Sequence, residues 1–87
     1  MKIIGEEIDV IVKFKKRAKP IPLKFSIIES DGTPQIIKVE KIIFTEEEKL
    51  AGISAYVYRC QSTIDGEFKP YELKYYIKDC RWVLYKI

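Results

Sequence analysis

The sequence contains no histidine and only two cysteines, Cys60 and Cys80, which lie twenty positions apart. Without histidine, two cysteines cannot form the usual ligand set of a zinc site, and the side chain most often used for acid–base catalysis is missing. Two cysteines are also too few for the disulfide framework of a small secreted protein. We therefore expect both thiols to be free.

The recurring sequence motifs of enzymes are absent as well. There is no glycine-rich phosphate-binding loop, no Gly-x-Ser-x-Gly nucleophile turn and no pair of acidic residues in a recognisable catalytic arrangement. We expect no catalytic residue, no metal ligand and no cofactor site, and we predict that the protein is not an enzyme.

Long apolar segments are missing too. Gly5, Glu6 and Glu7 interrupt the first residues before an apolar segment of the length found in signal peptides can form. No later run approaches the roughly 18 apolar residues that cross a membrane. These absences predict a cytoplasmic protein that has no membrane partner.

The composition is typical of a single folded domain. The chain has 87 residues, of which 47% are apolar and 33% are charged, with both signs well mixed. A chain of this composition is expected to fold, and a chain of this length can bury one modest core. We expect one domain over residues 1–87.

The clearest structural signal lies in residues 71–87, where apolar and polar side chains alternate with the period of a β-strand. Two such strands joined by a tight turn predict a hairpin. If the turn has an even number of residues centred on Asp79 and Cys80, the facing pairs are Ile77 with Trp82, Tyr75 with Leu84, and Leu73 with Lys86. This parity places Trp82, the only tryptophan, in the core.

Similar alternation predicts strands in the rest of the chain. The expected strands are residues 8–14, 21–29, 35–44, 53–61, 71–78 and 81–87. A cluster of turn-forming residues, Ser30–Pro34, separates the second strand from the third. Because the connections are short and no crossover helix is apparent, we expect the strands to be antiparallel.

The third of these strands does not keep one parity. Ile37 and Val39 fall on one face, and Ile42 and Phe44 fall on the other. One extra residue would restore a common face, so we expect a β-bulge near residues 40–41.

The segment after this strand has the features of a short helix. Thr45 and Glu48 have the spacing of a capping box, and Gly52 stands at the far end. We predict one or two helical turns over residues 45–52.

Apolar residues on both faces, a central bulge and aromatic-rich ends favour a curled sheet over a flat one. We therefore predict an all-β fold: a small antiparallel meander of five to six strands, curled into an SH3-like or OB-like partial barrel.

Six segments carry a further signal: Pro22–Phe25, Asp31–Gly32, Val39–Ile42, Tyr58–Cys60, Tyr71–Tyr75 and Arg81–Leu84. Over residues 22–87 they resemble an uncharacterised family of small bacterial β-proteins that end in a Tyr-x-Leu … Trp-x-Leu hairpin. The resemblance implies a fold and no activity.

Two functions fit this sequence. We favour a protein-interaction or self-assembly module, in which a tyrosine-rich face or an exposed strand edge contacts a protein partner or a second copy. The alternative is a nucleic-acid-binding small barrel. Its basis is an excess of positive charge near the start, because residues 1–24 carry seven basic and three acidic groups while the whole chain has a net charge of +3.

The nucleic-acid hypothesis assigns basic side chains to phosphates and tyrosines to base stacking. The candidate contacts are Lys13, Lys15, Lys16, Arg17, Lys19, Tyr56, Tyr58, Tyr76 and Tyr85. The same residues are also explained without a ligand, by a solvated loop that protects an edge strand and by tyrosines that close the second face of a thin barrel.

Overall fold

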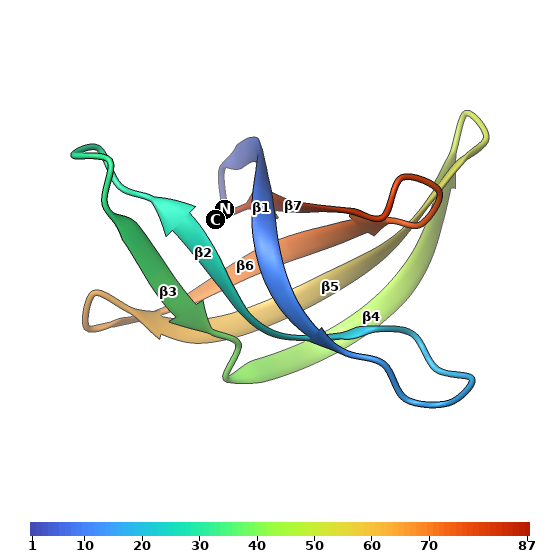
Figure 1. Ribbon diagram of the computed structural model, residues 1–87, viewed down its shortest axis with the longest axis horizontal. Helices are drawn as coiled ribbons and strands as arrows, with labels where there is room; N and C mark the ends of the chain where they lie inside the picture. Colours follow the sequence, from blue (N-terminus) through green and yellow to red (C-terminus); the bar gives the residue numbers. More distant parts are fainter.

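The computed structural model describes residues 1–87 and consists of seven antiparallel strands in one sheet (Figure 1). The strands are β1 (Ile3–Lys13), β2 (Ile21–Ile28), β3 (Pro34–Lys38), β4 (Lys41–Leu50), β5 (Ile53–Ile64), β6 (Glu67–Tyr76) and β7 (Arg81–Lys86). Their order is β3-β2-β1-β7-β6-β5-β4, and the sheet curls into an open half-barrel. The all-β antiparallel prediction is confirmed, whereas the predicted count of five to six strands is too low. The chain has no helix that could cross a membrane.

The extra strand comes from the predicted strand 35–44, which is divided at residues 39–40 into β3 and β4. A bulge is present, but it lies later than expected, between Ile42 and Phe44. Ile42 packs against the core, whereas Phe44 lies on the opposite face of the sheet beneath Arg59. The break at residues 39–40 therefore restores Ile42 to the core face, and the bulge that follows Ile42 turns Phe44 to the opposite face.

The helical prediction for residues 45–52 is wrong, because this segment is the end of β4 and its turn into β5. The glycine that resembled a helix cap belongs to a two-residue hairpin turn, in which Ala51 has φ 50° and Gly52 has φ 80°. Positive φ at both positions is the signature of the type I′ turn, whose twist matches that of the flanking strands. A helix this short is unstable alone, so the long ladder with β5 prevails.

Alanine is poorly suited to position 51, where the backbone has a positive φ. Alanine at positive φ costs about 1 kcal/mol, whereas asparagine tolerates the left-handed region. Ala51→Asn should therefore raise the free energy of unfolding by about that amount in urea melts. Ala18→Asn is the control, since Ala18 is exposed and is not among the residues with positive φ. A loss of stability in Ala51→Asn would contradict the turn assignment.

The final hairpin has the predicted parity but a shifted register. Trp82 pairs with Tyr75 rather than with Ile77, and Leu73 pairs with Leu84 rather than with Lys86. The turn spans four residues, Ile77–Cys80, and the Cys80 N–H donates to the Ile77 carbonyl at 3.4 Å within it. The shift is two residues, so each side chain keeps its face.

The core lies on the inner face of the curled sheet. Its largest fully buried side chains include Tyr58, Tyr71, Phe25 and Leu73. Trp82 is 7% exposed and packs with its ring centroid 5.4 Å from that of Tyr58. All six sequence-predicted strands contribute side chains to this cluster, which explains why their alternation is readable in the sequence.

Side chains join β3 to β5, where no strand ladder does. Ser62 Oγ donates to the Lys38 carbonyl at 2.7 Å, accepts the Glu40 N–H at 3.2 Å and lies 2.6 Å from the Tyr71 hydroxyl. We call these four residues the Ser62 junction. Because β3 and β5 are not neighbours in the ladder, the junction holds one end of the half-barrel together.

Candidate functional site

The outer face of the sheet is covered by its own side chains over β5–β7. Val57 and Val83 alternate with core residues and so point outward, yet each is 4% exposed. They are buried because Lys74, between them in the ladder, carries a long side chain that lies along the sheet.

Lys74 is held in this position by two neighbours. Its Nζ lies 3.0 Å from Glu48 Oε1 and 3.8 Å from the centre of the Tyr85 ring. Burial by itself lowers the pKa of this lysine, but the hydrogen bond and the charge of Glu48 outweigh burial and raise the pKa above its ordinary value. Lys74 therefore stays charged at neutral pH and remains paired.

Further pairs extend this cover across β4–β7. Arg59 Nε donates to Glu72 at 2.9 Å, and the same guanidinium lies 5.6 Å from the Phe44 ring centre. Arg81 lies 4.6 Å from the ring centre of Tyr76. Tyr76 and Tyr85, both predicted nucleic-acid contacts, are thus half-buried beneath basic side chains on the outer face.

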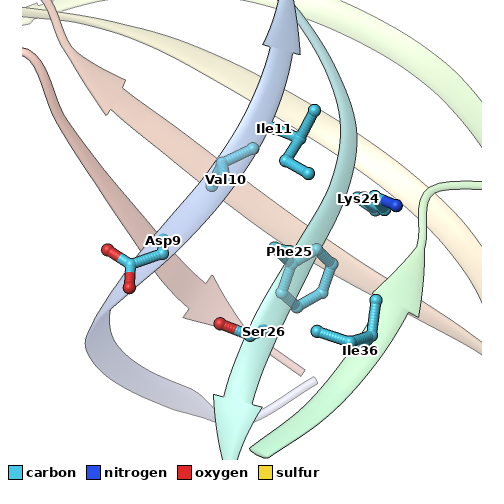
Figure 2. Close-up of a pocket in the computed structure, with 7 residues that line it drawn as sticks. All are labelled: Asp9, Val10, Ile11, Lys24, Phe25, Ser26 and Ile36. Carbon is cyan, nitrogen blue, oxygen red and sulfur yellow. The ribbon is translucent and has the colours of Figure 1, made fainter.

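The outer face over β1–β3 has no such cover. Ile11 is 53% exposed and Ile36 is 64% exposed, and both line an open cavity of about 300 Å³ (Figure 2). Asp9 and Lys24 lie on opposite sides of it, and Ser26 lies between the strands of the two isoleucines. We call these five residues the isoleucine face.

The predicted basic contacts lie at the end of β1 and in the loop that follows it. Lys13, Lys15, Lys16, Arg17 and Lys19, here called the basic loop, are all exposed, and none of them forms an ion pair. Their charges are therefore not neutralised within the chain.

One end of the basic loop meets the inner face of β5. Lys19 Nζ lies 5.4 Å from the ring centre of Tyr56, and the Tyr58 hydroxyl donates to the Pro20 carbonyl. The structure thus brings Lys19 and Tyr56 together. Tyr58 is 2% exposed, so its ring is closed to a ligand.

Tyr56 belongs to a row of aromatic rings that the sequence did not identify as a site. Tyr56 and Tyr75 are stacked with centroids 6.4 Å apart and an angle of 21° between the rings, and Tyr75 lies 4.8 Å from Trp82. We call these three the aromatic row. The sequence assigned Tyr75 and Trp82 only to the core of the final hairpin. Alternation gives the face on which each side chain lies, but not the pairing of Tyr75 with Tyr56 on β5.

The sequence also failed to single out Ile11 and Ile36. A signal was present, because each isoleucine stands beside a residue that already has core parity, Val10 and Ile37 respectively. An apolar residue at the outward position of a half-buried strand indicates either a second covered face or an exposed patch.

Buried hydroxyl and thiol groups near these surfaces are neutral. Burial raises the pKa of Tyr58, Tyr71 and Cys60, the last to about 12. The neighbouring Cys80 thiol, together with burial, raises the pKa of Tyr75. Both cysteines are free, and no three acidic or cysteine side chains are arranged so that they could hold a metal ion.

Comparison with protein-family models, with curated proteins and with solved structures gave no match. The function must therefore be argued from the two surfaces described above.

Proposed function

We propose that this protein is a small self-associating interaction module, an SH3-like or OB-like half-barrel that packs against a second copy through the isoleucine face. One observation carries the proposal. The same sheet covers its outer face over β5–β7 with long side chains and leaves it bare over β1–β3.

Exposed apolar side chains favour burial. Each square ångström of apolar surface removed from water contributes about 25 cal/mol, and contiguous apolar patches mark interaction sites more often than scattered residues do. Ile11 and Ile36 line the same cavity, with Lys24 and Ser26 of β2 between them. Two sheets that pack face to face interdigitate side chains of this kind.

The charges on this face favour a second copy as the occupant. Asp9 and Lys24 lie on either side of the cavity, so a two-fold axis can bring Asp9 of one copy to Lys24 of the other, and the reverse contact follows by symmetry. A standard interface buries about 800 Å² per partner. That is roughly one seventh of the 5920 Å² surface, an area that three of the seven strands can supply.

The proposal is tested by sedimentation velocity over a concentration series. We expect a reversible dimer. Ile11→Lys and Ile36→Lys should each raise the dissociation constant of this dimer at least tenfold, because the new lysine places an unpaired charge in the buried interface. Ile53→Lys is the matched control, since Ile53 is 58% exposed at the β4–β5 turn, outside the isoleucine face.

A charge exchange tests the geometry separately. Asp9→Lys or Lys24→Asp alone should weaken the dimer, and the two together should restore it, because each new lysine then meets a new aspartate across the axis. A protein that is monomeric at all concentrations, or a dimer that Ile53→Lys weakens as much as Ile11→Lys does, would overturn the proposal.

A further inference from the structure

We propose that the inner face beside the basic loop binds single-stranded nucleic acid, with the basic loop on the phosphates and with Tyr56 and Tyr75 stacked on bases. This surface is separate from the isoleucine face, so the inference does not depend on self-association.

The basic loop carries a high density of positive charge. Five basic side chains lie within seven consecutive residues, all exposed and none in an ion pair. Each is free to neutralise a phosphate and release its counterions, which is the main source of affinity for nucleic acid. The acidic residues 46–48 lie on β4 instead, so the phosphate chain is expected to follow the loop and to avoid β4.

The basic loop ends beside the aromatic row. The contacts of Lys19 with Tyr56 and of Pro20 with Tyr58 fix the end of the basic loop against β5. The loop charges therefore begin next to the aromatic row rather than on a distant part of the surface. A basic track beside stacking side chains is the usual arrangement for binding single strands.

The aromatic row presents two partly exposed rings. Tyr56 and Tyr75 are half-buried with nearly parallel rings, and the buried Trp82 packs beside Tyr75 on the next strand and fixes its orientation. Partly exposed, oriented rings stack on bases with little loss of side-chain freedom. Because bases inside a duplex are already stacked, such rings favour single strands.

The proposal is tested by fluorescence anisotropy of the intact protein with labelled oligo(dT) and oligo(U) over a salt series. Lys15→Gln, Lys16→Gln and Arg17→Gln combined should lower the affinity and reduce the slope of log affinity against log salt by up to about 2, from ~0.7 per lost phosphate contact. The control is Lys2→Gln, Lys38→Gln and Lys69→Gln combined, which removes the same charge outside the basic loop.

Tyr75→Leu tests the stacking contact. We expect about tenfold weaker binding with an unchanged salt slope, since the side chain carries no charge. Urea melts of each variant confirm that it is folded at the assay temperature. Tyr56→Leu tests the second stacking ring by the same measurements of affinity and salt slope, at a position farther from Trp82. No binding by the unaltered protein at low salt would overturn the proposal, as would an equal loss in the control triple variant. Either result leaves the self-association measured by sedimentation unaffected.

Discussion

Replacing Trp82 with alanine should lower the free energy of unfolding by about 3–5 kcal/mol, the range for deleting a large buried aromatic side chain. Trp82 is 7% exposed and its ring contacts both Tyr58 and Tyr75, so its removal opens a cavity in the middle of the core. Small domains have a total stability of only about 5–15 kcal/mol. The variant is therefore expected to be partly or wholly unfolded at 37 °C.

Urea denaturation followed by circular dichroism measures this effect. Ile53→Ala is the matched control, because its side chain is exposed and its removal should change the stability by less than about 0.5 kcal/mol. A loss below about 1 kcal/mol for Trp82→Ala would mean that the ring does not lie in the core and that the hairpin has the opposite parity.

Ser62→Ala should have the second largest effect, a loss of about 2–3 kcal/mol. The hydroxyl of Ser62 satisfies the Lys38 carbonyl, the Glu40 N–H and the Tyr71 hydroxyl, and both Ser62 and Tyr71 are fully buried. Its single hydrogen is directed to the Lys38 carbonyl, so Tyr71 must be the donor in their shared hydrogen bond. Alanine leaves all three groups without this partner. The Tyr71 hydroxyl is buried, and a buried unsatisfied group costs about 1–3 kcal/mol, whereas the part-buried Lys38 carbonyl and Glu40 N–H add less because water can reach them.

A double-mutant cycle with Tyr71→Phe separates these contributions. Tyr71→Phe alone should cost about 1 kcal/mol, because Ser62 retains its other two partners. In the Ser62→Ala background the same change should cost clearly less, since the tyrosine hydroxyl has already lost its acceptor. Additive losses would show that the two hydroxyl groups do not interact.

The sequence predicted the strands well because one buried face imposes a period of two on every strand. Alternation predicts the parity of the final hairpin but not its register, because turns of two and four residues give the same alternation and only the pairing of Tyr76 with Arg81 distinguishes them. The helix predicted for residues 45–52 failed for a similar reason. Its spacing is compatible with a cap, and only the pairing of β4 with β5 decides between helix and strand.

The candidate site was less accessible to sequence reasoning. The basic residues could be identified as a cluster, but their proximity to Tyr56 depends on the way Pro20 packs against β5. Tyr76 and Tyr85 could not be distinguished from Tyr56 by composition, although they lie on the opposite face of the sheet. The isoleucine face was missed because an exposed isoleucine and a buried one look alike until the cover over each strand is known.

The most direct test of self-association through the isoleucine face is an isotope-filtered NOE experiment on a mixture of labelled and unlabelled protein, which detects only contacts between copies. We predict intermolecular NOEs from the methyl groups of Ile11 and Ile36, and none from Ile53 at the β4–β5 turn. Intermolecular NOEs confined to other surfaces, or none at concentrations well above the measured dissociation constant, would contradict the account.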